Sequence, residues 1–450
     1  MEKTIVALST PSAHSAIAVV RLSGKDAVAI ADKVFRPAYI KTITELSGYH
    51  AAFGTVFSEG KPLDEAVALV FRAPKSYTGE DMVELSCHGN PQIASRLVAA
   101  CIAAGAAPAG AGEFTKRAFI NGKLDLSQAE AVAELIESEG ERAAAAAHQR
   151  IGGALSREIG EITDSLSFIA AQLAVWSDYP EEEDSPAVTR EQLIADFELN
   201  REKLAKMVAG YNTGRLIQNG IQIAIAGSPN VGKSTLMNLL CGTDRSIVTD
   251  IAGTTRDIIE ANARLDGISL RLLDTAGIRE TGDVIEKIGV ERAREAINTS
   301  DLVLFVIDAS RPLDEGDVEI FQQVKERPHL VLFNKNDLPR ESFQHDIKPD
   351  VEISAASGEG IETLRKKIKI TLGINLTQDN CLIASQRQFD CAQRAEKALS
   401  EAIFQLESGV TLDVAAILLE EAVSPLAELL GKSASDAVIE QVFAKFCVGK

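Results

Sequence analysis

Short apolar runs alternate with turn residues through the first 118 residues. The runs TIVALS, AIAVVRLSG, AAFGTV, EAVALVFRA and MVELSCHG have the period-two pattern of half-buried strands. One apolar run with helical spacing extends from Gln92 to Ala104. The pattern predicts a compact α+β domain over residues 1–118.

The texture of the chain changes after that point. Segments rich in Ala, Glu and Leu run from about Asp125 to Asn219 and return near the C-terminus, and they predict helices. Between them, IQIAIAG, LRLLDTAG, DLVLFVIDAS and HLVLFNKND alternate with helical stretches, as in a parallel sheet covered by helices. We expect a multidomain α/β plus α protein, with a helical domain in two parts (119–217 and 378–450) interrupted by a parallel α/β domain (218–377). A tandem arrangement of separate domains is the alternative.

The composition is that of an ordinary globular protein, with 46% hydrophobic and 25% charged residues among 450. The net charge of −19 opposes non-specific nucleic-acid binding, so contact with a polyanion would need local basic residues. The 6 cysteines lack CxxC pairing, which argues against a zinc site and structural disulfides. The sequence has no apolar run of ~18 residues and no signal-peptide layout, so we expect a cytoplasmic protein without a membrane span.

The strongest chemical signal is GSPNVGKS, residues 227–234, which matches the phosphate-binding pattern GxxxxGK[ST]. It follows a strand run and precedes the helical run TLMNLL, so its glycine-rich backbone can wrap phosphates. Lys233 would place its charge at the β- and γ-phosphate oxygens, where it serves catalysis as well as binding, and the Ser234 hydroxyl would bind Mg²⁺. The nucleotide contacts expected from this loop are Asn230, Val231, Gly232, Lys233, Ser234 and Thr235.

Three further motifs follow in the order of a GTP-binding domain. DTAG begins with Asp274 at the end of a strand run, where its carboxylate can hold the Mg²⁺ shell. In NKND, the Asp337 carboxylate can accept hydrogen bonds from guanine N1–H and the exocyclic amine; adenine lacks this pair, so the motif selects GTP. GTTRD, residues 253–257, suits a switch that senses Mg²⁺ and the γ-phosphate. The expected nucleotide contacts are Thr254, Thr255, Asp274, Thr275, Ala276, Gly277, Asn334, Lys335, Asp337, Ser354 and Ala355.

The element that would orient the attacking water departs from the commonest GTPase pattern. Ile278 follows DTAG, where a glutamine usually stands. Glu280, Asp283 and Glu286 come next, and any of them could polarise water if the segment closes over the nucleotide. Taken singly, each is explained more readily as a solvated charge on a loop.

The order of these motifs resembles that of the translation-factor-like GTPases with GTTRD and DTAG. The complete set comprises VVRLSG, SYTGED, VELSCHG, GEFTKRAFINGKLDLSQAEAV, GSPNVGKST, DTAGIRETGDVIEKIGVERA, NKND and FCVGK. It spans the chain and resembles the MnmE (TrmE) family of tRNA-modification GTPases. The resemblance implies a Ras-like P-loop G domain inserted into a helical domain, and an N-terminal folate-binding domain through which two chains form a homodimer.

The resemblance also implies an activity and partners. Family members act with the flavoprotein MnmG, here expected as a heterotetramer, to place aminomethyl or carboxymethylaminomethyl groups on the wobble uridine of tRNA. The one-carbon unit comes from a tetrahydrofolate derivative. Matched residue by residue, K⁺ would be held by Asn230, Thr254 and the backbone of Thr249 and Ile251, with Thr249 also at the GTP. Mg²⁺ would be held by Ser234 and Thr255, and Glu286 would orient the hydrolytic water.

For the folate pocket the matched positions are Arg21, Glu84, Lys123 and Lys450. A carboxylate such as Glu84 can accept the paired N–H donors of a pterin ring, while Arg and Lys suit folate's carboxylates or formyl oxygen. Cys447, near the end of the chain, could act as a nucleophile in the modification. An unreactive terminal thiol explains it equally well.

Two other classes of function stay open at this point. One is a GTP-dependent switch for RNA or ribosome assembly, which the N-terminal motifs and FCVGK disfavour. The other is a stand-alone folate-dependent transferase with a regulatory G domain. Basic residues that could help to hold tRNA, or simply form solvated helix faces, are Arg142, Arg150, Arg157, Lys366, Lys367 and Lys369.

Overall fold

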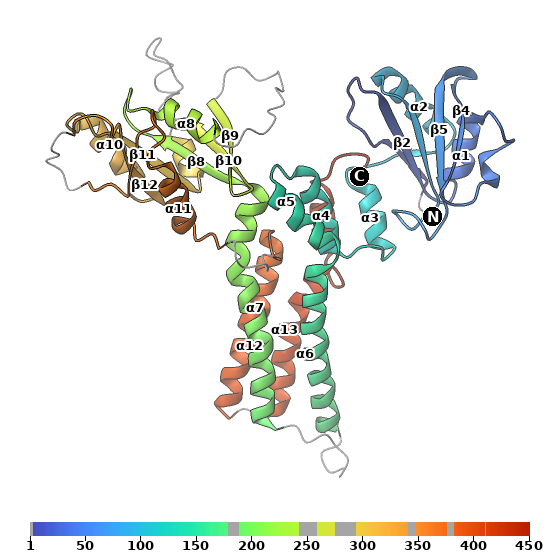
Figure 1. Ribbon diagram of the computed structural model, residues 1–450. Helices are drawn as coiled ribbons and strands as arrows, with labels where there is room; N and C mark the ends of the chain where they lie inside the picture. Colours follow the sequence, from blue (N-terminus) through green and yellow to red (C-terminus); the bar gives the residue numbers. More distant parts are fainter. Residues whose placement is uncertain are drawn as a thin grey trace. The chain divides into compact units, whose positions relative to one another are not determined.

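The computed structural model describes residues 3–178, 189–242, 259–274, 294–340, 347–375, 382–409 and 411–450. The chain divides into two compact units, whose elements are labelled in Figure 1. The first unit contains residues 1–133, 150–186 and 413–450, and the second contains 134–149 and 187–412. The domain boundaries expected from the sequence stay predictions.

Among the described residues, the first unit contains a seven-stranded sheet in the order β3-β4-β5-β6-β2-β1-β7. Neighbouring strands are antiparallel, except for the parallel pair β1 and β7. Alternate residues of β5, such as Ala66, Ala68 and Val70, are buried in one core with residues of α1 and α2. The strands are β1 (Ile5–Leu8), β2 (Ile17–Ser23), β3 (Phe35–Pro37), β4 (His50–Ser58), β5 (Lys61–Phe71), β6 (Met82–His88) and β7 (Ala107–Pro108).

The helices of this N-terminal part differ in number from the expectation. The run from Gln92 is confirmed as α2 (Pro91–Ala103), whose N-cap Asn90 accepts a hydrogen bond from the Gln92 amide. The expectation of a single helical run is wrong, because α1 (Ala27–Val34) and α3 (Glu113–Ile120) are also present. Both have eight residues, too few for the helical period to stand out, and the run AVAI in α1 is as apolar as a strand.

The end of the chain returns to the N-terminal sheet. After α13 (Leu412–Leu429) and α14 (Asp436–Phe443), Phe443 and Phe446 pack in one cluster with Leu126 at the start of α4 (Leu126–Glu137). Val448 then forms a β-bridge with Ala111. The remaining helices that include residues of this unit are α5 (Glu141–Ile151) and α6 (Ala154–Asp178), and a short 3-10 helix covers Ile43–Glu45.

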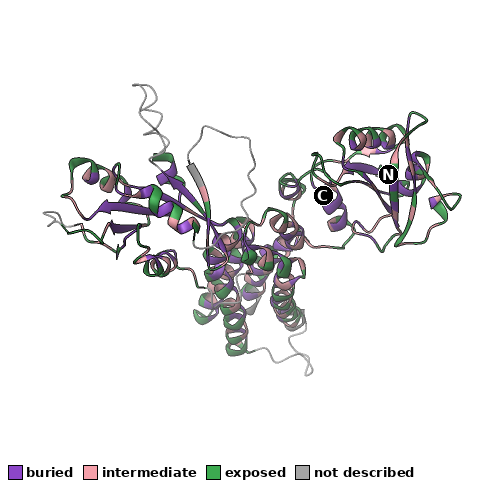
Figure 2. Cartoon of the chain, turned by 45° about the horizontal axis from the view of Figure 1, so that its top comes forward, coloured by how far each residue is buried: buried purple, intermediate pink, exposed green. Residues whose placement is uncertain are grey.

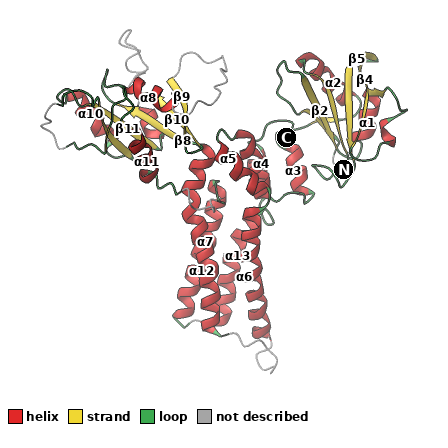
Figure 3. Cartoon of the chain, in the orientation of Figure 1, coloured by secondary structure: helices red, strands yellow, loops and turns green. Residues whose placement is uncertain are grey.

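Within the described residues, the second unit contains a six-stranded sheet in the order β13-β12-β11-β8-β10-β9. All neighbours are parallel except β10 and β9, which are antiparallel. Figure 3 shows the strands of this sheet in yellow. The central strands are apolar and buried, as Figure 2 shows, and every residue of β11 is buried. The strands are β8 (Ile221–Ala226), β9 (Ile259–Leu265), β10 (Ile268–Asp274), β11 (Leu302–Asp308), β12 (His329–Asn334) and β13 (Val351–Glu352).

Helices α8 (Lys233–Gly242), α10 (Glu315–Val324) and α11 (Ile361–Thr371) accompany this sheet. On either side of it in sequence, α7 (Arg190–Asn219) and α12 (Gln386–Glu407) run antiparallel, since Tyr211 stacks on Phe389 and Arg190 donates to the Leu406 carbonyl. Helices flanking a parallel α/β sheet were expected, and both are confirmed. No described helix has the length and apolarity of a membrane span.

Candidate functional site

The phosphate-binding loop joins β8 to α8 at the carboxyl edge of the second sheet. A side chain at Gly227 would overlap the Val306 carbonyl of β11, and one at Gly232 would overlap the Asn334 amide. Both glycines have positive φ, 149° and 99°, a region open mainly to residues without a Cβ. Glycine is therefore required at both positions, because the loop backbone lies too close to Val306 and Asn334 for a side chain to fit.

Lys233, the first residue of α8, is folded back onto this loop. Its Nζ donates to the carbonyls of Gly227 at 2.6 Å and Ser228 at 2.8 Å, and the residue is 5% exposed. Burial lowers the pKa of Lys233, although Asp274 and Asp317 oppose that shift. The ammonium group thus lies beside the loop that would wrap the phosphates.

The structure brings Ser234 and Asp274 together. The Ser234 hydroxyl donates to the Asp274 carboxylate at 3.2 Å, where the N-terminus of α8 meets the end of β10. A hydroxyl and a carboxylate at that edge are the oxygen donors that Mg²⁺ prefers, so the pair fits the expected ion. Thr235 is exposed on the next position of α8, and Asn230 is exposed in the loop with a φ of 61°.

Asn334, the first residue of NKND, links the loop after β13 to the phosphate-binding loop. Its side-chain nitrogen donates to the Val231 carbonyl at 2.8 Å, and its oxygen accepts from the Ala355 amide at 2.9 Å. Ser354 is buried and its hydroxyl accepts from the Ser357 amide. Asp337 is exposed beyond the end of β12. Asp337 is therefore accessible to a ligand, and Asn334, three residues before it, is held by hydrogen bonds to Val231 and Ala355.

Lys335, which follows Asn334, lies in an ion pair with a neighbouring strand end. Its Nζ contacts the Asp308 carboxylate at 2.5 Å. Burial alone would raise the pKa of Asp308, but hydrogen bonds from Lys335 and Ser310 lower it. The ion pair therefore joins the residue after β12 to the end of β11.

Several predicted contacts lie outside the described residues. They are Thr249, Ile251, Thr254, Thr255, Thr275, Ala276, Gly277 and Glu286. The roles expected for these residues stay predictions.

A second polar site lies in the first unit, between β2 and β6. Arg21 and Glu84 are directly paired in the strand register, and Arg21 Nη2 lies 2.8 Å from Glu84 Oε1. The guanidinium lies 6.0 Å from the Tyr77 ring centre and 5.6 Å from that of Phe114. The side chains of Arg21 and Glu84 are 17% and 22% exposed, so this ion pair is mostly shielded from solvent but still accessible to it.

The C-terminal residues form part of this second site. The Gly449 carbonyl accepts hydrogen bonds from Arg21 at 3.3 Å and from Ser9 at 3.1 Å. The Lys450 carbonyl accepts from the Phe114 amide at 3.2 Å. Cys447 is exposed, and its carbonyl accepts from the Gly112 amide. The end of the chain thus lies against the residues that carry the Arg21–Glu84 pair.

Lys123 lies in the turn after α3. Its Nζ donates to the Pro74 carbonyl at 3.2 Å, in the loop that leads to Tyr77. The side chain also passes the open face of Gly79. Lys123 is therefore held against the SYTGED loop, residues 76–81.

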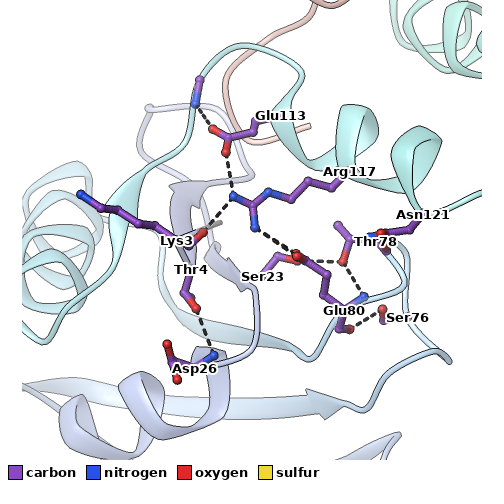
Figure 4. Close-up of polar contacts among 11 residues, drawn as sticks. Lys3, Thr4, Ser23, Asp26, Ser76, Thr78, Glu80, Glu113, Arg117 and Asn121 are labelled. Atoms are coloured by element: carbon purple, nitrogen blue, oxygen red, sulfur yellow. Dashed lines mark hydrogen bonds and ion pairs between the residues drawn. The ribbon is translucent and has the colours of Figure 1, made fainter. Parts of the chain in front are cut away.

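Sequence reasoning missed Arg117, which fixes that loop. Figure 4 shows its guanidinium between Glu80 and Glu113, with a further hydrogen bond to the Lys3 carbonyl at 2.9 Å. Burial would lower the pKa of Arg117, but hydrogen bonds to the two carboxylates raise it. Glu80 also accepts from Ser23, so Arg117 connects α3, the loop and β2. The motifs SYTGED and GEFTKRAF contain Glu80, Glu113 and Arg117. The i,i+4 spacing of Glu113 and Arg117 is a signal for their helical ion pair, but nothing in the sequence pairs Arg117 with Glu80.

The basic residues considered for tRNA are mostly engaged elsewhere. Arg150 is 1% exposed and so cannot present its charge to a polyanion. Arg142 donates to the Asp266 carbonyl, and Lys369 pairs with the Asp266 carboxylate at 2.5 Å. The expectation that these residues present positive charge to tRNA is therefore wrong for Arg150. Arg142 and Lys369 have less capacity for such contacts, because both already interact with Asp266.

The loop, the paired Ser234 and Asp274, and the bridged NKND motif on a parallel sheet define a P-loop GTP-binding protein. The family profile "MnmE helical domain" matches residues 126–447, and "GTP-binding protein TrmE N-terminus" matches residues 4–123. The tRNA modification GTPase MnmE of Aquifex aeolicus is 42% identical over 100% of both chains. That of Thermotoga petrophila is 40% identical over 99% of this chain and 100% of its own. The chain belongs to the MnmE family and is a GTP hydrolase.

Among solved structures, a single-residue variant of Aquifex aeolicus Era bound to GDP.AlF4- is 31% identical over 39% of this chain and 65% of that chain, with a TM-score of 0.26.

Proposed function

We propose that this chain hydrolyses GTP with K⁺ and Mg²⁺ and acts in the cytoplasm with MnmG to modify tRNA. The product would be an aminomethyl or carboxymethylaminomethyl group at the 5-position of wobble uridine. The one-carbon unit would come from a tetrahydrofolate derivative held beside Arg21 and Glu84. The observation that carries the proposal is this half-buried ion pair, flanked by two aromatic rings and the chain's own C-terminal residues.

The donor set of the second site fits a folate derivative. The Glu84 carboxylate can accept the paired N–H donors of a pterin, and the rings of Tyr77 and Phe114 offer apolar faces to it. Arg21, Lys123 and Lys450 are cationic partners for folate's carboxylates or formyl oxygen. When bound, the folate derivative supplies the one-carbon unit; the protein's residues bind and orient it.

The nucleotide site supports a role for both cations. Ser234, with Thr255, would hold Mg²⁺, and Asn230 would contribute to the K⁺ ligands together with Thr249, Thr254 and Ile251. A fixed cation beside the transferring phosphate neutralises developing charge. Lys233 would leave its two carbonyl partners for the phosphate oxygens, and Glu286 would orient the attacking water.

The outer face of the N-terminal sheet supports a homodimer. Phe53 and Val67 are paired in the register of β4 and β5, and they are 45% and 41% exposed. Their strand neighbours Ala66 and Ala68 face the helices, so this pair faces away from the core. A second chain that covered this face would remove both apolar side chains from water.

The partner MnmG would make most of the contacts with tRNA. A chain with a net charge of −19 repels a polyanion. Of the basic residues, Arg150 is buried, Lys369 pairs with Asp266, and Arg142 donates to the Asp266 carbonyl. We therefore expect tRNA to bind the complex with MnmG more tightly than this chain alone.

The test of the whole proposal is nucleoside analysis by mass spectrometry. Cells that lack this protein are complemented with the intact chain, with Arg21→Ala or with Ser234→Ala, and tRNA is digested to nucleosides. The intact chain should restore aminomethyl-type wobble uridines, and neither variant should. Unchanged nucleosides in the deletion strain would contradict the proposal and favour the ribosome-assembly switch.

Two variants test the G-domain chemistry. Turnover should rise with protein concentration, and with K⁺ over Na⁺ at equal ionic strength, while Asn230→Ala should lose the preference for K⁺. Glu286→Ala should abolish hydrolysis and leave GTP binding intact. Turnover that is indifferent to both ion and protein concentration would rule out a K⁺-dependent dimer.

A further inference from the structure

A buried carboxylate lies behind the phosphate-binding loop. Asp317, in the first turn of α10, is 0% exposed. It takes part in a capping box: Asp314 accepts from the Asp317 amide at 2.9 Å, and Asp317 accepts from the Asp314 amide at 3.2 Å. This explains where α10 begins, but it uses only part of the Asp317 carboxylate.

Part of the remaining hydrogen-bonding capacity of Asp317 is used by the phosphate-binding loop. The Ser228 hydroxyl donates to Asp317 Oδ1 at 2.5 Å, across 89 positions of sequence. Ser228 is itself 5% exposed, so both partners of this hydrogen bond are removed from solvent. A buried hydroxyl on a carboxylate is a strong, charge-assisted contact.

Arg311 compensates the charge of Asp317. Its guanidinium contacts Asp317 Oδ1 at 3.2 Å and Oδ2 at 3.0 Å, and it also contacts Asp314. A carboxylate buried without such a partner would be strongly destabilising. The contact with Arg311 therefore gives the buried carboxylate beside Ser228 a cationic partner.

Ser228 also carries one of the two carbonyls that hold Lys233. Its side chain is fixed by Asp317, while its carbonyl accepts from Lys233 Nζ at 2.8 Å. The same residue therefore links the buried carboxylate to the lysine that would contact the phosphates. A shift of Ser228 would move the backbone that cradles the phosphates and one resting partner of Lys233 together.

We propose that Asp317 is a positioning residue for nucleotide binding: through Ser228 it fixes the phosphate-binding loop and the starting place of Lys233. The proposal rests on GTP binding by this unit and is independent of K⁺, folate and MnmG. Without the anchor, the loop occupies its binding conformation for a smaller fraction of the time, and the apparent affinity falls by that fraction. GTP and GDP lose affinity equally, because both contact the same loop.

The variants that test this are Ser228→Ala, Asp317→Asn and the double variant, measured in the full-length protein. Ser300→Ala is the matched control. Ser300 is also a buried serine, 4% exposed, whose hydroxyl donates to the Ile297 carbonyl at 3.1 Å. It precedes β11 and so lies at the opposite end of that strand from the carboxyl edge where the loop sits.

Calorimetric Kd values for GDP and for a non-hydrolysable GTP analogue should rise about tenfold in Ser228→Ala and Asp317→Asn. KM for GTP should rise by a similar factor, with kcat within about twofold of wild type. The double variant should bind nucleotide no more weakly than the single variant with the higher Kd, since both substitutions remove the same hydrogen bond. Because Asp317→Asn also disturbs Arg311, the decisive variant is Ser228→Ala, which removes one hydroxyl only.

Three results would overturn the proposal. Ser228→Ala could bind both nucleotides as Ser300→Ala does. The single effects could add in the double variant, or kcat could fall with KM unchanged, as expected from a smaller folded fraction. A wild-type chain that binds no GTP would instead overturn the GTPase assignment itself, which distinguishes the two failures.

Discussion

The side-chain amide of Asn334 donates to the carbonyl of Val231, so one residue of the NKND motif holds the phosphate-binding loop. The contact is possible because the next residue in the loop is Gly232, whose missing side chain leaves room for the Asn334 nitrogen. The other end of Asn334 accepts from Ala355. Base-side and phosphate-side loops are thereby tied into one rigid edge of the sheet.

Gly232→Ala should break this arrangement. The added Cβ would overlap Asn334 Nδ2, and alanine is strained at a φ of 99°. We expect a loss of roughly 2 kcal/mol or more in stability and a loss of GDP binding, followed by thermal unfolding and calorimetry. Gly242→Ala, at the end of α8, is the control: its added Cβ meets no described atom within 4 Å, so it should be neutral or slightly stabilising. Equal behaviour of the two variants would contradict the role of Gly232.

The sequence was sufficient for features that depend on local spacing. Apolar strand runs before GSPNVGKS, DTAG and NKND predicted β8, β10 and β12, and parallel strands place such motifs at one edge. The segments rich in Ala, Glu and Leu predicted the helices α7 and α12, which precede and follow this sheet in the sequence. The family resemblance supplied Arg21 and Glu84, which by spacing alone would have been surface charges on two strands.

Features that depend on contacts between distant residues were beyond the sequence. Asp317 and Ser228 are 89 positions apart, and Gly449 lies 428 positions from Arg21, so no local pattern pairs them. Arg117 has a local partner in Glu113, four residues earlier on α3, but its contact with Glu80 depends on the fold. Short helices such as α1 were missed because eight residues are too few for a helical period to be distinguished from a strand run.

Asp337→Asn should change which base is accepted. A carboxylate accepts from guanine N1–H and the amino group, whereas an amide both donates and accepts, which matches xanthine. We expect the affinity for GTP to fall about 100-fold or more and the affinity for xanthosine triphosphate to rise. Competition binding with both nucleotides measures this. Retained GTP preference would mean that Asp337, exposed beyond β12, does not contact the base.

Stability should depend on pH through Asp64 and His88. A hydrogen bond to Asp64 raises the pKa of His88 above 6.5; burial opposes charge on Asp64, but hydrogen bonds from His88 lower its pKa below 3.8. The contribution from His88 is therefore fully present below about pH 6.5 and is lost as the pH rises through its raised value. The contribution from Asp64 is lost only as the pH falls below 3.8.

Thermal unfolding of wild type and His88→Gln measures this dependence. The difference in Tm should be largest near pH 5 to 6 and should shrink above neutral pH. His50→Gln is the control, because the His50 ring contacts Ser47 and the Gly48 carbonyl instead of a carboxylate. A His88→Gln difference that is constant across the pH range would exclude the ion pair as its source.

The described cysteines should differ widely in reactivity. Burial raises the pKa of Cys101 to about 12, so roughly one molecule in 10⁴ is a thiolate at pH 8. Cys447 is exposed and should react with iodoacetamide at least about 100-fold faster than Cys101. Peptide mass spectrometry during labelling measures both rates, and Cys447→Ser should remove the fast phase. Rapid labelling of Cys101 would show that α2 opens readily.

Arg21 and Glu84 should determine folate binding without affecting the nucleotide site, because they lie in the other unit. Arg21→Ala removes a charged donor, and Glu84→Gln removes the charge of the acceptor while keeping its shape. Each should weaken the binding of a formyl derivative of tetrahydrofolate by roughly 10- to 100-fold, the usual effect of losing a hydrogen bond to a charged group. Calorimetry measures the Kd, and kcat for GTP should stay at the wild-type value.

Arg36→Ala is the matched control for Arg21→Ala. It removes the same charge from the same sheet, but Arg36 lies on the edge strand β3 and stacks over Phe57 at 4.4 Å. It should leave folate affinity unchanged. If Arg36→Ala and Arg21→Ala weaken binding equally, long-range charge accounts for the effect and the site between β2 and β6 is wrong. If Glu84→Gln binds as wild type does, the ring of the ligand does not donate to Glu84, and the folate must be held by the cationic residues alone.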